Sequence, residues 1–362
     1  MKLSALFRLR PFRRASAESA PRARRSKRGR AALAVVCGGG AFALLQLLFV
    51  VFTEISPVLS DPIYAARERQ LGALRAEKPN ERLVLFLGSS RVQDAFRAGD
   101  VKSATAFNFG TPGAGPIANS LYLRRLHRAG HVPDVLLLEV MYPLCADGGL
   151  HPPEGPLITA DRVTRAERDL LIERYGFPGE YYRRLWRRSA LVPFITHGFK
   201  LIGRAAPDAL PNNQQMRVAH GTDEYGWLAP ADNLKPDPEK RDKQLAHYKP
   251  WVENWRAGPW THAALTDTFE MCRERNVTVA LVLMPESAAF RDLPNPDSKA
   301  RISGYVAELK AQFGCSVIDA RAWFADDEFL DGHHLMRPGA AKFTTRLITE
   351  GIDPLVKARG AK

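Results

Sequence analysis

The chain has 362 residues, of which 45% are hydrophobic and 25% charged, enough to bury a full core in one large domain or two smaller ones. The formal net charge is +13, but residues 1–30 hold eleven Lys and Arg against one acid, Glu18, and so carry +10 of it. The basic character therefore belongs to an N-terminal tail, which argues against a folded domain that binds nucleic acid.

An uncharged apolar stretch follows the basic tail. Residues 31–53 carry no charged side chain and a single amide, Gln46, and are numerous enough to cross a bilayer with some tilt. The basic flank before this stretch and Glu54 after it predict a cytoplasmic N-terminus and an extracytoplasmic (periplasmic) remainder. A cleaved signal peptide is the alternative, although its apolar region usually has only about 7–15 residues and no A-x-A-like site follows here. The sequence thus predicts a single-pass protein of the cell membrane, with a cytoplasmic tail at 1–30, a transmembrane helix at 31–53 and a connector at 54–80.

The cysteines give no sign of a metal or redox motif. Cys37 lies in the apolar stretch, which leaves Cys145, Cys272 and Cys315 for the folded part. No Cys-x-x-Cys pair is present, which excludes a zinc ribbon and a thioredoxin-like motif. Three cysteines allow at most one intramolecular disulfide, and buried free thiols are the simpler interpretation.

The folded domain is expected from about residue 81, with strands and helices in alternation. Apolar runs predict buried strands at 83–87, 104–109, 133–140, 277–284 and 314–319. Amphipathic patterns predict helices at 65–77, 117–129, 261–275, 297–313 and 340–350. This spacing indicates an α/β fold: a three-layer α/β/α, flavodoxin-like domain with about five parallel strands, over residues 81–362.

The middle of the chain breaks this alternation. Residues 146–258 are rich in Pro, Trp, Tyr and Arg, and we interpret them as an insertion between sheet strands. Helices are predicted at 164–175 and 180–204, followed by a polar stretch at 205–249. Insertions at the ligand edge of a sheet often carry specificity, and a purely structural elaboration is the other interpretation.

Two stretches far apart in the chain carry candidate catalytic residues. Ser90 follows a buried strand that ends at Gly88, at a predicted strand-to-helix turn where ligands bind in open α/β sheets and negative charge is favoured. An N-capping serine is the plain alternative. Asp331 and His334 lie three residues apart, so the acid can orient a histidine general base. Together they supply a nucleophile, a base and its orienter.

Three blocks of this sequence resemble the SGNH (GDSL-type) hydrolase superfamily. Gly88-Ser89-Ser90 is similar to the family's Gly-Asp-Ser nucleophile block, with Ser89 in place of Asp. Asn108 to Gly113 is similar to the second block, Asn-x-Gly-x-x-Gly, and Asp331 to His334, with Gly339 beyond, is similar to the fifth. The resemblance covers residues 81–350. It implies that Ser90 is the nucleophile, His334 the base and Asp331 its orienter, and that the backbone N–H groups of Ser90 and Gly113 form the oxyanion hole.

The third block departs from the family pattern. The family has Gly-x-Asn-Asp there and adds the Asn side chain to the oxyanion hole, whereas this chain has Glu139-Val140-Met141-Tyr142, with no amide. Either two backbone donors suffice or another group helps. Arg91 and Asn108 are the candidates for such a contact with the oxyanion or the substrate.

The chain's organisation also resembles that of membrane-anchored SGNH proteins of envelope-polymer acylation, such as alginate O-acetylation proteins and the D-alanine transfer protein. The resemblance implies a serine esterase or O-acyltransferase acting on acyl (chiefly acetyl) esters of an envelope or exported glycan. The implied partners are an acylated glycan or small acyl ester, the lipid bilayer and a membrane-bound O-acyltransferase, with no nucleic acid and no cofactor. The alternative is a catalytically inactive module that binds glycan or a partner acyltransferase.

Neighbouring residues offer alternatives within the last block. His333 is a second candidate base, and Asp326 and Asp327 are alternative acids. With Asp331 and His334 they would make a metal site, but no second ligand cluster and no HExxH motif is present, so no metal is expected. The turn at Gly88–Arg91 is not a P-loop, and no G-x-S-x-G elbow of an α/β-hydrolase occurs.

Overall fold

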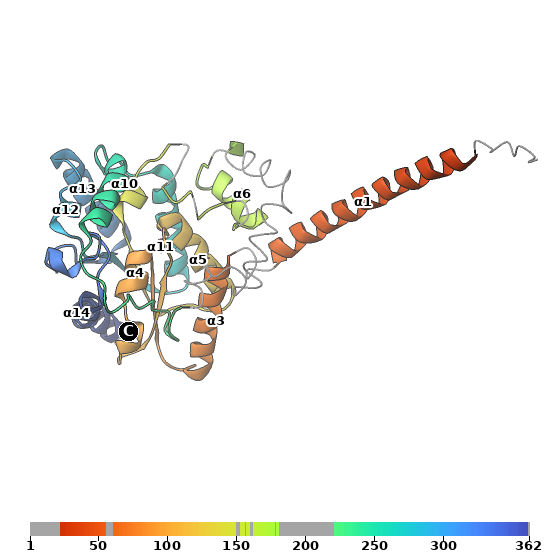
Figure 1. The fold of residues 1–362 in the computed structure, drawn as a ribbon. Coiled ribbons are helices and arrows are strands. Elements are labelled where there is room, and N and C mark those ends of the chain that lie inside the picture. The colour runs from red at the N-terminus through yellow and green to blue at the C-terminus, as the bar shows by residue number, and fades with distance from the viewer. Residues whose placement is uncertain are drawn as a thin grey trace, which may run out of the picture. The chain divides into compact units, whose positions relative to one another are not determined.

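The structure is a computed structural model that describes residues 22–55, 61–149, 153–155, 157–159, 162–177, 179–180 and 221–360 (Figure 1). It divides into two units, Met1–Val51 and Phe52–Lys362, and each is described by itself.

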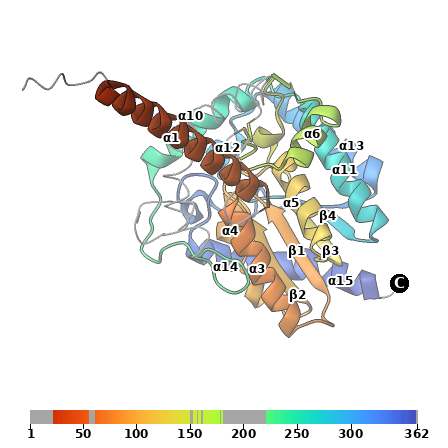
Figure 2. The same cartoon turned by 90° about the vertical axis from the view of Figure 1, so that its right-hand side faces the viewer.

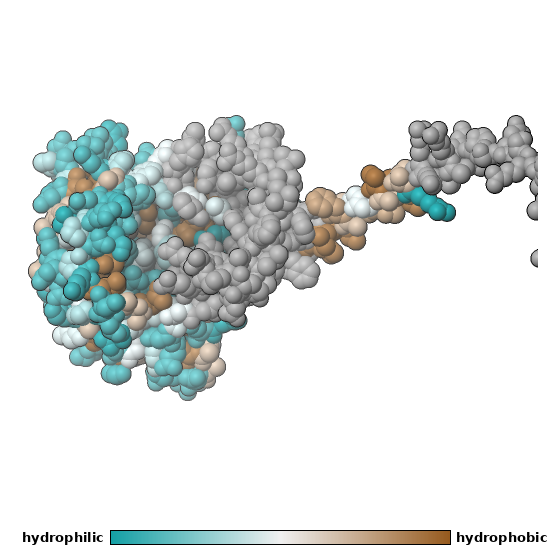
Figure 3. All heavy atoms as spheres, in the orientation of Figure 1, coloured by the Kyte–Doolittle hydropathy of each residue, from teal (hydrophilic) through white to brown (hydrophobic). Residues whose placement is uncertain are grey.

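The N-terminal helix α1 (Arg22–Ile55) contains the stretch predicted to span the membrane. Its described side chains include large apolar residues that are exposed, drawn brown in Figure 3: Leu33, Val35, Val36, Phe42, Leu44, Leu45, Leu47 and Leu48. Among the described residues, no helix is both long enough and apolar enough to cross a bilayer. Gln46 and residues 49–53 of the predicted span lie outside the residues whose side chains are described, and residues 1–21 of the basic tail lie outside the described chain.

The second unit is built on a parallel sheet of five strands. These are β1 (Leu83–Gly88), β2 (Thr105–Gly110), β3 (Val135–Glu139), β4 (Thr278–Leu283) and β5 (Ser316–Asp319). Their order is β2-β1-β3-β4-β5, the order of flavodoxin-like sheets (Figure 2). The predicted α/β class and all five predicted strands are therefore confirmed.

Helices cover both faces of this sheet because its strands are apolar on both faces. Leu85 and Leu87 of β1 belong to a core cluster shared with α3 (Pro62–Glu77), α5 (Pro116–Arg128), α11 (Pro259–Glu274) and α13 (Pro296–Phe313). Val84 and Phe86 alternate with them and pack with α4 (Ser90–Ala95), α14 (Arg337–Leu347) and α15 (Asp353–Gly360). Each such buried side chain stabilises the fold by about 1.5–3 kcal/mol.

Helix α3 is packed into the domain, although its residues were expected in a connector at 54–80. Tyr64 and Leu71 belong to the main core cluster. Arg67 is fully buried and donates to the backbone oxygens of Asn108 (2.9 Å) and Gly110 (3.1 Å). The charged residues of this stretch suggested an exposed connector. One of them, Arg67, is buried and hydrogen-bonded, so the helix is part of the core.

The described part of the insertion contains two helices. α6 (Arg165–Glu173) matches the first predicted helix and begins with a capping box between Thr164 and Glu167. The second predicted helix, 180–204, lies outside the described residues from 181 onward. α10 (Pro238–Val252) lies largely in the stretch described as polar, where no helix was predicted, and it begins with Asp237 as N-cap and Pro238 in its first turn.

The remaining elements are short or lie at the C-terminus. They are η1 (Ala98–Asp100), η2 (Tyr142–Cys145), α12 (Ala288–Arg291), η4 (Asp326–Glu328) and the π-helical η5 (Ile348–Ile352). The last predicted helix starts three residues earlier than expected, as α14, and continues through η5 into α15, which was not predicted. Cys145, Cys272 and Cys315 are free and buried, as expected.

Candidate active site

The turn after β1 presents Ser90 at the carboxyl edge of the sheet. Ser89 is the N-cap of α4, and its hydroxyl accepts the N–H of Arg91 at 3.2 Å. Ser90 is the first helical residue, so the capping role proposed as its alternative falls to its neighbour. Gly88 is required before this turn because a Cβ there would lie 2.3 Å from the Val92 side chain and 2.6 Å from a Glu139 oxygen.

Ser90 meets Asp331 and His334 although 244 residues separate it from the histidine. Ser90 Oγ lies 2.7 Å from His334 Nε2, and His334 Nδ1 lies 2.8 Å from Asp331 Oδ2. Asp331 and His334 lie on a loop that is closed by an antiparallel bridge between Phe329 and Leu335. Asp331 Oδ1 also accepts the backbone N–H of His334 at 3.0 Å. The three predicted side chains thus form one continuous hydrogen-bonded chain.

Burial and hydrogen bonding act in opposite directions on this chain. Burial alone would raise the pKa of Asp331, but the hydrogen bond and charge of His334 outweigh it and hold that pKa far below its usual range. Burial alone would lower the pKa of His334, but the hydrogen bond and charge of Asp331 raise it above 6.5. An ionised acid that orients a basic imidazole against a hydroxyl is the arrangement that general-base activation of a serine requires.

Asn108, predicted as a contact of the oxyanion or substrate, is committed to the backbone instead. The residue is fully buried. Its Nδ2 donates to the carbonyl oxygens of Val92 (2.8 Å), Gln93 (3.2 Å) and Phe96 (2.7 Å), and its Oδ1 accepts the N–H of Gly110 at 2.9 Å. It therefore fixes α4, which carries Ser90, to the end of β2.

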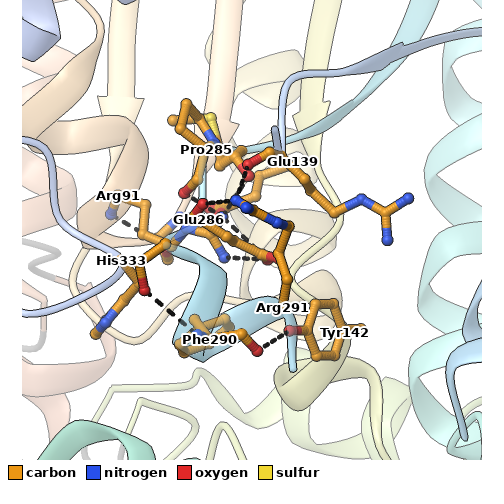
Figure 4. Close-up of polar contacts among 12 residues, drawn as sticks. Arg91, Glu139, Tyr142, Pro285, Glu286, Phe290, Arg291 and His333 are labelled. Carbon is orange, nitrogen blue, oxygen red and sulfur yellow. Dashed lines mark hydrogen bonds and ion pairs between the residues drawn. The ribbon is translucent and has the colours of Figure 1, made fainter. Parts of the chain in front are cut away.

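Arg91, the other predicted contact, points into the protein and is only 2% exposed (Figure 4). Its Nη2 donates to the carbonyl oxygens of Met284 (2.7 Å) and Pro285 (3.1 Å), and its Nη1 lies 3.3 Å from Glu286 Oε1. Consecutive residues of a helix point about 100° apart, so adjacency to Ser90 does not make Arg91 point in the same direction as that serine. The guanidinium belongs to the support of the site.

Gly113 lies on a loop that begins beside the nucleophile turn. Gly88 and Gly110 are paired in the sheet, and the N–H of Thr111 donates to the carbonyl oxygen of Gly88 at 2.8 Å. Gly113 is exposed and has φ +76, a left-handed conformation that favours glycine. The loop that carries Gly113 and the turn that carries Ser90 therefore start at the same edge of the sheet.

The alternative acids and base occupy other places. Asp326 and Asp327 are exposed, and Asp326 accepts the backbone N–H of Ala288 at 2.7 Å. His333 is buried, with its ring stacked on Phe290 at a centroid distance of 5.2 Å, and burial keeps its pKa well below 6.5.

Three of these side chains have the spacing of a metal site. The ligand atoms of Asp331, His333 and His334 lie within 4.8 Å of one another. Both ring nitrogens of His334 are already engaged, with Ser90 and with Asp331. A metal bound here would have to replace one of these two hydrogen bonds.

Some side chains around the site were missed by sequence reasoning. Asp94 lies one turn after Ser90 on α4, interacts electrostatically with His334 and has its pKa raised by burial. The four-residue spacing from the serine could have identified it. Tyr248 of α10 packs edge-on against His333, and no local pattern predicts that contact.

Comparison with known proteins gives a distant structural likeness and no match in sequence. No family model matches the chain, and no curated protein matches it. A solved structure titled as the lipase/acylhydrolase from Enterococcus faecalis aligns with a TM-score of 0.32 and 12% sequence identity, over 74% of this chain and 94% of that one. The functional assignment therefore rests on the geometry of the site.

Proposed function

We propose that the protein is a serine esterase or O-acyltransferase that works through an acyl-Ser90 intermediate. The observation that carries this proposal is the hydrogen-bonded chain from Ser90 Oγ through His334 to Asp331, with distances of 2.7 and 2.8 Å. A partly buried histidine held between a carboxylate and a serine hydroxyl activates that hydroxyl as a nucleophile.

The reaction divides into two proton-balanced steps. Ser90 Oγ attacks the ester carbonyl while His334 Nε2 accepts the hydroxyl proton, and the ionised Asp331 stabilises the imidazolium. His334 then returns the proton to the departing alcohol, which leaves the acyl group on Ser90. In the second step His334 takes a proton from water or a sugar hydroxyl, whose oxygen attacks the acyl group, and gives the proton back to Ser90.

The oxyanion would be bound by the backbone N–H groups of Ser90 and Gly113. Support comes from the position of Ser90 as the first residue of α4 and from the loop that starts beside Gly88 and carries Gly113. Each such donor typically contributes about 2.7–4 kcal/mol to transition-state stabilisation.

The substrate class that fits the sequence blocks is an acyl ester, chiefly acetyl, of an envelope or exported glycan. The proposal places the catalytic domain outside the cytoplasm, anchored by residues 31–53, with a membrane-bound O-acyltransferase as partner. Support comes from the uncharged apolar stretch between the basic tail and Glu54. It also comes from the resemblance of the chain's organisation, an apolar stretch before a domain with the three SGNH-like blocks, to that of anchored SGNH proteins.

Covalent labelling tests the mechanism directly. A fluorophosphonate probe should label the wild-type protein at Ser90, and Ser90→Ala should abolish both labelling and the hydrolysis of a small aryl ester. Ser89→Ala is the matched control, because it removes the adjacent hydroxyl and the N-cap of α4. It should lower the free energy of unfolding by about 0.5–2 kcal/mol, and the protein should still be labelled. A folded wild-type protein that takes no label and cleaves no ester would refute the proposal.

The second candidate is an inactive binding module, favoured by one observation: the segment Glu139 to Tyr142 contains no amide, whereas the matching block of the resembled family has an Asn donor. On this hypothesis an acetylated oligosaccharide binds equally to wild type and Ser90→Ala, and neither deacetylates it. Loss of acetate from the oligosaccharide with wild type alone would favour catalysis instead.

A further inference from the structure

The carboxylate of Glu139 lies directly behind the nucleophile turn. β3 and β1 are neighbours in register, with Leu138 opposite Leu87, so Glu139 ends its strand at the same edge where β1 ends at Gly88. The side chain is 2% exposed. A buried carboxylate needs polar partners. The two contacts described for Glu139 are both with residues of the turn that contains Ser90.

Each oxygen of Glu139 contacts one neighbour of the nucleophile. Oε2 accepts the backbone N–H of Ser89 at 2.5 Å. Oε1 lies 3.5 Å from Nε of Arg91. The residues on either side of Ser90 are thus held by one side chain.

Arg91 extends this support toward the loop that carries Asp331 and His334 (Figure 4). Its guanidinium donates to the backbone at Met284 and Pro285 and pairs with Glu286. The next residue, Ser287, donates its N–H to the carbonyl oxygen of Gly332 at 2.9 Å, directly after Asp331. A continuous path of contacts therefore joins the end of β3, the nucleophile turn and the loop of Asp331.

The charges in this cluster do not balance. Glu139 and Glu286 share the one guanidinium of Arg91, and Arg321, whose charge also acts on Glu286, is already paired with Asp319. Among the described residues, Glu139 Oε1, Glu286 Oε2 and Arg91 Nε have no hydrogen-bond partner. Such incomplete pairing is costly in a core and calls for an explanation other than stability.

We propose that Glu139 is a positioning residue, which fixes the turn so that Ser90 Oγ stays aligned with His334 Nε2. The proposal rests on the serine mechanism proposed above. An ionised carboxylate only accepts hydrogen bonds, so Glu139 cannot replace the missing Asn as an oxyanion donor. Glu139 begins the segment that stands in place of the family's third block, and it contacts the turn of Ser90 from behind.

Two isosteric variants test this role against each other. Glu139→Gln and Glu286→Gln each remove one negative charge from the same cluster and leave one carboxylate for Arg91, so both should fold. In Glu139→Gln the amide nitrogen would face either the Ser89 N–H or Arg91, and the turn loses one of its two contacts. Misplacing a reactive group by about 1 Å can cost a factor of 10².

The expected result is a selective loss of turnover. In Glu139→Gln, kcat for a small ester and the rate of fluorophosphonate labelling should fall by about 10–100-fold with KM nearly unchanged, as expected when alignment and not binding is lost. Glu286→Gln should change either rate by less than about threefold, because Glu286 does not contact the backbone of the turn. Equal losses in the two variants, or a rise in KM that accounts for the loss, would overturn the proposal.

A readout without turnover separates this inference from the proposed function. Amide hydrogen exchange at Ser89 should be at least about tenfold faster in Glu139→Gln than in wild type, and unchanged in Glu286→Gln. If wild type takes no probe, the serine mechanism fails, whereas exchange at Ser89 still reports whether Glu139 holds the turn. Unchanged exchange in Glu139→Gln would refute the positioning role even in an active enzyme.

Discussion

Two buried clusters of charged side chains differ in how completely they are paired. One, the site cluster, consists of Arg91, Glu139 and Glu286 and supports the nucleophile turn. The other, the α3–α5 cluster, consists of Asp61, Arg125, Arg162 and Glu167 and ties the start of α3 to α5 and to the segment around α6. The first has two acids for one base, and the second has two of each.

Each carboxylate oxygen of the α3–α5 cluster accepts a hydrogen bond. Asp61 Oδ1 accepts from Arg162 at 2.8 Å, and Oδ2 from Tyr122 (3.1 Å) and Arg125 (3.3 Å). Glu167 accepts from Arg125 with both oxygens, at 2.7 and 2.8 Å. No residue of the Ser90–His334–Asp331 chain belongs to this cluster, and its geometry is that of a structural ion-pair network.

The difference suggests that buried carboxylates are left incompletely paired where they serve the site. A buried network in which every carboxylate oxygen is hydrogen-bonded keeps an element in place, whereas carboxylates with incomplete pairing concentrate at sites with another task. We therefore expect changes in the Ser90–His334–Asp331 chain and at Glu139 to reduce turnover, and changes in the α3–α5 cluster to reduce stability.

The largest effect should come from Asp331→Asn. Without the ionised acid, kcat should fall by about 10³–10⁴-fold, because His334 loses its tautomer and the stabilisation of its imidazolium. Rates need neutral His334, so the wild-type rate should rise with pH through a pKa above 6.5. That pKa should fall in Asp331→Asn, because burial lowers it and the hydrogen bond and charge of Asp331, the largest of the opposing effects, are lost.

The pH dependence of kcat and the labelling rate from pH 5 to 9 measure both effects. Asp326→Asn is the control, since Asp326 is an exposed acid five residues earlier that the sequence offered as an alternative orienter. A profile in Asp331→Asn that matches wild type would exclude Asp331 as the orienting acid. A loss of similar size in Asp326→Asn would transfer the role to that residue.

The next effect concerns stability alone. Asp61→Ala leaves Arg125 and Arg162 short of a buried counter-charge and should lower the free energy of unfolding by about 3–5 kcal/mol. Asp100→Ala, which breaks the exposed pair with Arg97, should cost no more than about 1 kcal/mol. Urea unfolding measures both. The comparison fails if the folded fraction of Asp61→Ala labels more slowly than wild type.

The strands and the meeting of Ser90, His334 and Asp331 were predictable because their causes are local. Apolar runs of five or six residues fix where β1 to β4 form, and the rule that parallel strands end at one edge places Ser90 there. The three-residue spacing of Asp331 and His334 predicts their contact, because a turn of that length brings the carboxylate to the imidazole ring.

The supporting residues were not predictable in this way, because their roles depend on strand register and side-chain direction. Nothing next to Glu139 in the sequence indicates that it meets the Ser89 N–H, since that contact needs β3 beside β1. Adjacency to Ser90 suggests that Arg91 contacts the oxyanion or substrate, and the second sequence block suggests the same for Asn108, but both turn inward and donate to backbone oxygens. In the sequence Arg67 resembles an ordinary surface charge, because its hydrogen bonds to the backbone of Asn108 and Gly110 depend on the tertiary structure.

The smallest predicted effect tests whether backbone donors can replace a cation. Glu154 is buried and accepts the N–H groups of Gly115 (2.8 Å), Ile117 (2.9 Å) and Ala118 (2.9 Å) at the start of α5, and no described side chain forms an ion pair with it. Burial raises its pKa from 4.5 to about 7 despite these bonds. A folded-state pKa above the unfolded value gives stability that is complete below about 4.5 and is lost as pH rises through about 7.

Glu154→Gln cannot titrate, so it separates this loss from the rest of the molecule. The stability of wild type relative to Glu154→Gln should fall by about 1–3 kcal/mol between pH 4.5 and 8. Melting temperatures of the two proteins across this range measure the difference. Parallel curves would mean that three backbone N–H groups stabilise a buried carboxylate as fully as the arginines of the α3–α5 cluster do, and that the unpaired charge of the site cluster is less costly than we infer.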